Sequence, residues 1–204
     1  MTGRAAVRTP PTRRRLGRDE RRSATITAAA TVFARSGFAA TSMADVTAAA
    51  GVSHLIVYRH FESKAALYEA VLGRSLDQLR VVMDAESAVG RYGPTAAALL
   101  VAARSDPDAF TVLWRHASRE PEFSGWTDRA RRLLVTRARA ALTEQVGADH
   151  RGWAAKATVS YVVEAVLGWV EDGDPRADAR FLAATDAALR AGIRTWARTD
   201  VRPA

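Results

Sequence analysis

A glycine turn flanked by two short amphipathic segments lies between residues 37 and 67. Ser42 begins the first segment, where its hydroxyl can accept from the amide of Asp45 while the Asp45 carboxylate reaches back to Ser42 in a capping box. Gly51 ends the segment, because glycine readily adopts the left-handed conformation that closes a helix. The sequence therefore predicts a short helix, a tight turn and a second short helix, which is the order of a helix-turn-helix.

The second segment is predicted as a helix over residues 54–60, capped by Ser53. Val57 and Phe61 lie four residues apart and form its inner stripe. The residues left largely on the outer side are His54, Leu55, Tyr58 and Arg59. A short helix with so exposed an outer side is expected to bind another molecule there.

These residues resemble the DNA-binding domain of the TetR family of bacterial regulators. The pattern T-x-x-D-V-x-x-A-A-G-V-S followed by V-Y-x-H-F-x-S-K-x-x-L is matched here, with serine at its first position. The resemblance is strong over residues 18–70, and the rest is similar only in length and helical layout. It implies that the second helix of the motif enters the major groove of DNA. The alternative is a helical hairpin that only packs within the fold.

The resemblance also implies a role for individual residues. Ser53, His54 and Leu55 are expected at base edges, where histidine can make one hydrogen bond and leucine an apolar contact with a thymine methyl. The family often has lysine, arginine or a small residue at the last two of these positions, so specificity is expected to depend on DNA shape and arm contacts. Arg59 is expected at a base or a phosphate. The positions that hold phosphates in the family are Thr41, Ser42, Tyr58, His60 and Lys64, although His60 has a solvated surface histidine as its alternative.

Composition sets further limits. The chain has 204 residues, of which 48% are hydrophobic and 25% charged, as in ordinary globular proteins. It has no cysteine and only four scattered histidines, so we expect no disulfide, no metal site and no cofactor. No apolar run is long enough to span a membrane and no secretory signal precedes the motif, so the expected location is the cytoplasm.

Positive charge is concentrated at the start of the chain. Residues 1–22 hold eight arginines against two acidic residues, and so contribute +6 of the net charge of +8. Residues 1–17 are expected to be a disordered basic arm that inserts into the minor groove beside the motif. A solubilising tail is the alternative. The arginines assigned to DNA here are Arg13, Arg14, Arg15 and Arg18.

Helical periodicity continues to the end of the chain, and no strand pattern occurs. The fold class is therefore all-α, with about nine helices in three parts: the arm over residues 1–17, a helix-turn-helix domain over 18–66, and a ligand-binding and dimerisation bundle over 67–204. Asp106 and Asp174 each precede a proline and are expected to start helices. With these two, the helices predicted outside the motif cover residues 18–36, 63–89, 94–105, 107–118, 123–146, 151–171 and 175–197.

The last two helices are predicted to form a dimer interface. Apolar residues cover most of the circumference from Trp153 to Val170, so this helix must be buried on two sides. We expect it and the final helix to meet their copies in a four-helix interface, with a purely intramolecular core as the alternative. The expected interface residues are Val163, Val166, Val170, Phe181, Thr185, Leu189, Gly192 and Trp196.

The resemblance further implies a pocket for a small-molecule effector in the bundle. Its candidate lining residues are Phe110, Trp114, Trp126, Tyr161, Glu164 and Trp169, each with plain core or surface packing as the alternative. The expected function is that of a dimeric repressor, released from a palindromic double-stranded DNA operator by the effector. The alternatives are a sequence-tolerant architectural DNA binder and a helical enzyme, for which no catalytic constellation is visible.

Overall fold

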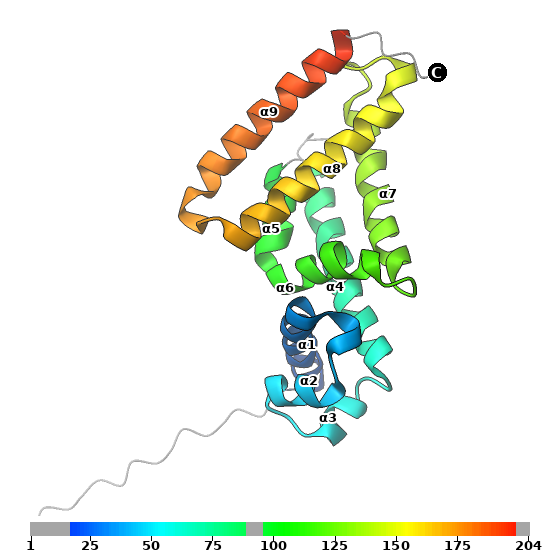
Figure 1. Cartoon of the computed structure of the whole chain (residues 1–204), viewed down its shortest axis with the longest axis vertical. Coiled ribbons are helices and arrows are strands. Elements are labelled where there is room, and N and C mark those ends of the chain that lie inside the picture. The colour runs from blue at the N-terminus through cyan, green and yellow to red at the C-terminus, as the bar shows by residue number, and fades with distance from the viewer. Residues whose placement is uncertain (1–16, 89–95, 199–204) are drawn as a thin grey trace, which may run out of the picture.

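The computed structural model describes residues 17–88 and 96–198, which are helical throughout apart from short turns. One end of the molecule holds the three helices of the helix-turn-helix region (Figure 1). These are α1 (Arg18–Ala40), α2 (Met43–Ala50) and α3 (His54–Tyr58). The predicted all-α architecture, with a helix-turn-helix region followed by a helical bundle, is confirmed.

A long helix, α4 (Lys64–Ala88), leads from this end into the bundle. The bundle continues with α5 (Ala96–Ser105), α6 (Pro107–Thr111), a π-helical turn η1 (Val112–His116), a 3-10 turn η2 (Ala117–Arg119) and α7 (Ser124–Ala141). It ends with α8 (Ala148–Asp172), a 3-10 turn η3 (Pro175–Ala177) and α9 (Asp178–Arg198). In Figure 1, α9 lies along the outer edge of the bundle beside α8.

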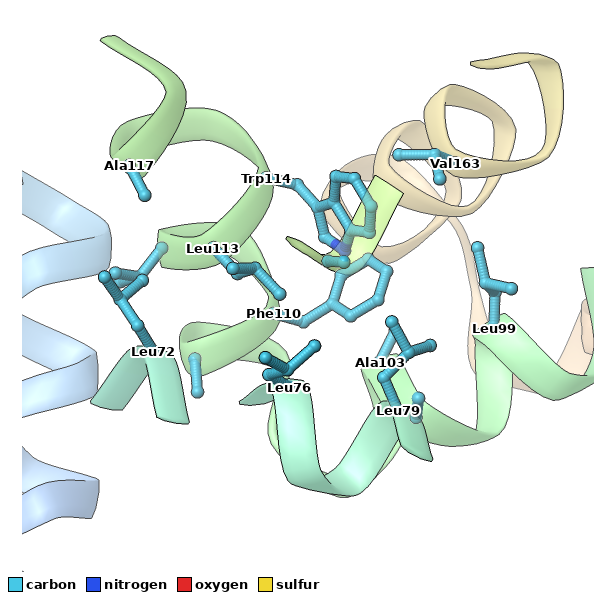
Figure 2. Packing of buried hydrophobic residues seen from close by; sticks show 14 of the residues in the cluster. Leu72, Leu76, Leu79, Leu99, Ala103, Phe110, Leu113, Trp114, Ala117 and Val163 are labelled. Carbon is cyan, nitrogen blue, oxygen red and sulfur yellow. The ribbon is translucent and has the colours of Figure 1, made fainter. Parts of the chain in front are cut away.

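One continuous apolar core joins the two ends of the molecule. Its central part is built around α6 and η1, whose side chains Phe110, Leu113 and Trp114 point toward α4, α5 and α8 (Figure 2). They meet Leu72, Leu76 and Leu79 of α4, Leu99 and Ala103 of α5, and Val163 of α8. The helix-turn-helix region is therefore packed against the bundle rather than tethered to it.

Several helix boundaries differ from the sequence prediction, and the helix predicted over residues 54–60 ends already at Tyr58. The helix predicted over residues 107–118 begins at Pro107 with the Asp106 cap, but widens into the π turn η1. The helix predicted over 123–146 ends at Ala141. Next, α8 begins at Ala148 instead of residue 151, and the Asp174 cap starts the 3-10 turn η3 before α9.

A kink interrupts α1 near its end. Gly37 has φ 74° and ψ 176°, so the regular helix stops there, as the sequence predicted, and three further residues follow before Thr41. A side chain is strongly disfavoured in this conformation, because non-glycine residues rarely occupy it. The kink turns the chain from α1 toward α2.

Candidate nucleic-acid interface

The turn between α2 and α3 has the predicted geometry. Ser42 and Asp45 form the capping box: the Asp45 amide donates to Ser42 Oγ at 3.2 Å, and the Ser42 amide donates to Asp45 Oδ2 at 2.8 Å. The Ser42 hydroxyl also donates to Asp45 Oδ2, at 2.7 Å, and this bond, followed by the bond from the Ser42 amide, holds the pKa of the Asp45 carboxyl below its usual value. Gly51 ends α2 in the left-handed conformation, with φ 63° and ψ 30°. Both predictions are confirmed.

The outer side of α3 is open to solvent. Leu55 is 74% exposed and Tyr58 48% exposed, whereas Val57 is fully buried on the inner side. The rings of His54 and Tyr58 stack with centroids 5.8 Å apart. Ser53 precedes the helix, but its side chain makes no capping hydrogen bond, which corrects that prediction. An exposed leucine beside two stacked rings is a surface suited to contact with another molecule.

Two residues predicted to hold phosphates are instead bonded inside the protein. Lys64 Nζ donates to the carbonyl oxygens of Phe38 and Thr41, at 2.8 Å each, and lies 4.3 Å from the centroid of the Phe38 ring. Thr41 is buried, and its hydroxyl donates to the carbonyl oxygen of Gly37 at 2.7 Å. Both side chains therefore hold the turn between α1 and α2, and their phosphate contacts stay predictions.

A basic hollow of about 350 Å³ lies between the start of α1 and the end of α3. Its lining consists of Arg18, Arg21, Ile56, Arg59 and His60. Sequence reasoning assigned Arg18, Arg59 and His60 to DNA but missed Arg21 and Ile56. The spacing of Arg18 and Arg21 on one helical face was the available signal for Arg21. Of the predicted disordered arm over residues 1–17, only Gly17 is described, and it is the residue that precedes α1. The predicted contacts of Arg13, Arg14 and Arg15 lie outside the described residues.

The residues predicted to line an effector pocket are scattered. Phe110 and Trp114 are buried in the core, and Trp126 packs against Gly73. Trp169 stacks on Phe181 at a centroid distance of 4.7 Å and donates to Asp178 Oδ1 at 2.6 Å. Tyr161 and Glu164 are exposed on α8, where Glu164 pairs with Arg115. The set is thus divided between the core, the contact with α9 and the surface of α8, and its role in binding an effector stays a prediction.

The residues predicted for the dimer interface mostly face their own chain. Val163 and Val166 are fully buried in the core, and Thr185 is buried against α8, which corrects their assignment to a surface. Phe181 stacks on Trp169, and Trp196 lies 5.2 Å from Trp153 between ring centroids. A Cβ built on Gly192 would lie 3.6 Å from the Trp196 ring. The half-buried members of the set are Val170, Phe181, Leu189, Gly192 and Trp196.

The helix-turn-helix region and the bundle meet at η1. His116 Nε2 lies 2.9 Å from the carbonyl oxygen of Ala34 in α1. Beside this contact, the rings of Phe33, Phe38, Tyr68 and Phe123 form an aromatic cluster with neighbouring centroids 4.7 to 6.3 Å apart. Burial raises the pKa of the Tyr68 phenol, with a smaller contribution from Glu120. The connection between the two regions is thus tightly packed.

Residues 26–71 match the family model described as bacterial regulatory proteins, tetR family. This match begins within α1 and ends in α4, and so contains the capped turn and the exposed helix. Residues 26–71 therefore form the region that characterises bacterial regulatory proteins of the TetR family.

Two curated regulators of transcription resemble part of this chain. One is the HTH-type transcriptional activator FasR of Mycolicibacterium smegmatis, 48% identical over 65 residues, which are 32% of this chain and 30% of that protein. Another is the HTH-type transcriptional repressor KstR2 of Rhodococcus jostii, 37% identical over 70 residues, or 34% of each chain. The similarity thus spans about a third of the length of these relatives, all of which are named as regulators of transcription.

A solved structure extends the TetR fold to the bundle. The TetR-like transcriptional regulator from Rhodococcus sp. RHA1 superposes with a TM-score of 0.70 at 23% identity, covering 88% of this chain and 98% of that one. Identity this low establishes the fold alone. Of the helices within residues 17–88 and 96–198, none has the length and apolar character that crossing a membrane requires.

Proposed function

We propose that this chain is a dimeric regulator of transcription that binds an inverted-repeat site in double-stranded DNA through α3. The observation that carries the proposal is the exposed outer side of α3, where His54, Leu55 and Tyr58 project from a helix held by the capped turn before it. A solvent-exposed helix of this kind contacts base edges when it lies in the major groove. The family match over residues 26–71 supports this assignment.

The ratio of affinity for a specific site to affinity for scrambled DNA distinguishes a sequence-specific regulator from an architectural DNA-binding protein. Selection from a random DNA library should yield an inverted repeat, and affinity for it at fixed salt should exceed that for scrambled DNA by at least about 10³-fold. Leu55→Ala should change the selected bases, whereas Tyr58→Phe should weaken selected and scrambled DNA alike. Equal affinity for both DNAs in the wild-type protein would favour the architectural alternative.

The dimer in this proposal uses the outward faces of α8 and α9. Small side chains and Tyr161 lie there, exposed or half-exposed, and small residues let two helices approach closely. The proposed contact residues are Ala157, Tyr161, Ala165 and Gly168 of α8 with Ala184, Ala188 and Ala191 of α9. A twofold axis through this four-helix contact supplies the two copies of α3 that an inverted repeat requires.

Repression relieved by an effector is the form of regulation that we propose. Arg115 in η1 pairs with Glu164 and Glu171 of α8, and its neighbour His116 bonds to α1. A ligand that moves α8 therefore acts on α1 through two adjacent residues. A reporter fused to the promoter bearing the selected site checks the sign: loss of the protein should raise expression, and lowered expression would indicate an activator, as FasR is named.

A further inference from the structure

A groove runs between α1 and α4, from the start of α1 to the loop before α6. It consists of two hollows of about 600 and 360 Å³, whose linings share Arg74 and Gln78. Its apolar lining includes Ile26 of α1 and Val81 of α4, and Val81 is 62% exposed. We call this feature the α1–α4 groove. It lies on a different side of α1 from the basic hollow.

The two arginines that line the groove are already engaged by the protein. The guanidinium group of Arg22 lies over the Phe61 ring, 5.1 Å from its centroid. Arg74 pairs with Asp106 and donates to Thr27 Oγ1 at 3.0 Å. The carboxylates of the groove are therefore the groups that remain for an outside ligand.

Two carboxylates, one toward each end of the groove, have no cationic partner. Asp19 lies in the first turn of α1 and Asp108 in the first turn of α6, and neither forms an ion pair with a described residue. Asp108 accepts a hydrogen bond from the neutral hydroxyl of Thr31, at 2.6 Å. Asp77 pairs with Arg80, but both side chains are exposed and such a pair is weak. The groove therefore suits a cationic ligand.

The part of the chain that precedes α1 joins it beside the groove. Asp19 comes shortly after Gly17, where the described residues begin. The far end of the groove is near Thr31, because Thr31 bonds Asp108. From Asp19 to Thr31 the helix rises about 18 Å, whereas residues 8–16 reach about 30 Å when extended. These residues are thus long enough to turn back and follow the groove.

We propose that residues 8–16 lie in the α1–α4 groove when the protein is free of DNA, and that DNA competes with the groove for them. This segment has no acidic residue, and its four arginines are Arg8, Arg13, Arg14 and Arg15. Arginine stems can cover Ile26 and Val81 while the guanidinium groups reach the carboxylates. The contact goes beyond the proposed DNA binding, because it forms within the free protein.

The first test needs no DNA. The chain has no cysteine, so Thr9→Cys gives one attachment point for a nitroxide spin label in the full chain. The label should broaden the NMR signals of the Gln78 and Val81 amides much more than that of Ile56, which lines the basic hollow. Equal broadening of Val81 and Ile56 would show that the segment has no preference for the groove, and would overturn the inference.

A change of charge tests what holds the segment. Asp19→Asn combined with Asp108→Asn keeps the acceptor oxygens but removes both charges, and should reduce the broadening of Val81. The matched control combines Asp128→Asn with Glu144→Gln, which removes the same charge from exposed positions on α7 and just after it. The control should broaden Val81 as the unsubstituted labelled protein does. Unchanged broadening in the groove variant would contradict the inference.

Competition with DNA is measured as affinity for the selected inverted repeat at fixed salt. A segment that occupies the groove nine-tenths of the time lowers the affinity about tenfold, so the groove variant should bind up to about tenfold more tightly. The control variant measures the gain that comes from lost negative charge alone. Replacing the four arginines of residues 8–16 by serine should abolish the extra gain of the groove variant.

Equal gains from the groove variant and the control variant would overturn the competition. Absence of specific DNA binding by the wild-type protein would overturn the proposed function instead. The spin-label measurement would still decide whether the segment lies in the groove, so the two failures are distinguishable.

Discussion

His116 Nε2 lies 2.9 Å from the carbonyl oxygen of Ala34, although 82 residues separate them in the sequence. The contact joins the end of η1 to the last regular turn of α1, next to the kink at Gly37. Since a carbonyl oxygen only accepts, Nε2 carries the proton in this contact.

His116→Leu should therefore lower the free energy of unfolding by about 1 kcal/mol or slightly more, because the partly buried carbonyl of Ala34 loses its side-chain donor. His116→Gln can still donate and should recover much of the loss. Urea denaturation of both variants measures the difference. Equal destabilisation by the two substitutions would mean that ring packing, and not the hydrogen bond, is what matters.

Lys64→Met should destabilise the protein by about 1–3 kcal/mol even without DNA, because two carbonyl oxygens lose their ammonium donor. The chain offers a direct control in its second lysine, Lys156, which is exposed on α8. Lys156→Met should leave the urea midpoint almost unchanged. If Lys64→Met altered only DNA affinity, the lysine would act on phosphate as the sequence had suggested.

Two glycines should differ in their tolerance of alanine. Gly37→Ala should cost about 1–3 kcal/mol, since its backbone conformation is nearly restricted to glycine and its new Cβ would lie 3.4 Å from His116 Nδ1. Gly51→Ala should cost only about 1 kcal/mol, because the left-handed helical region is less restrictive and no atom lies within 4 Å of the added carbon. Thermal unfolding ranks the variants, and the reverse order would contradict the described geometry.

The hydrogen bonds that Asp178 accepts at the start of α9 should weaken in acid. Hydrogen bonds from Arg104, and then from Trp169, lower the pKa of Asp178 below its usual value of 3.8. The stabilisation is therefore present above about pH 4 and is lost as pH falls through the lower folded-state pKa. Asp178→Asn should be less stable than the wild type at pH 7. The difference in their free energies of unfolding should become smaller below pH 4. The control is Asp172→Asn, which changes an exposed carboxylate at the end of α8. Its free energy of unfolding should differ little from that of the wild type at either pH.

Gly168→Arg should prevent the proposed dimer and leave a folded monomer. A Cβ at Gly168 meets no atom within 4 Å inside the chain, so the substitution acts on the proposed partner surface alone. Gly152→Arg is the matched control, because Gly152 lies in the same helix with equally open space. Light scattering should report a monomer only for Gly168→Arg. A dimer in both variants would place the interface elsewhere.

The features predictable from sequence were those encoded locally. The capping box of Ser42 with Asp45 and the turn at Gly51 depend on residues a few positions apart, and both were correct. The end of α7 was missed because Leu142 and Val146 are buried four residues apart, which continues the helical periodicity through a turn. Arg151 donates to the carbonyl oxygens of Thr143 and Val146 there, a compensation that periodicity does not reveal.

The site was harder to predict where the sequence did not show which way a side chain points. On α8 apolar residues surround most of the helix, and nothing in their spacing tells which face meets the core, so Val163 and Val166 were assigned to the wrong surface. Lys64 matched a family position, but its destination depends on Phe38 and Thr41, more than twenty residues away. Arg21 became part of the basic hollow only once α1 was placed beside α3.

The π turn at Val112–His116 changes the helical register between α6, which precedes it, and η2, which follows it. A π turn holds about one residue more than an α turn, and each residue of an α-helix rotates the chain by about 100°. Returning this turn to α geometry would therefore rotate His116 away from Ala34 and break the hydrogen bond between them. The ring contacts of Phe33 with Tyr68 and of Phe38 with Phe123 would still join α1 to the rest of the molecule, so a change of this turn adjusts one contact without separating the two regions.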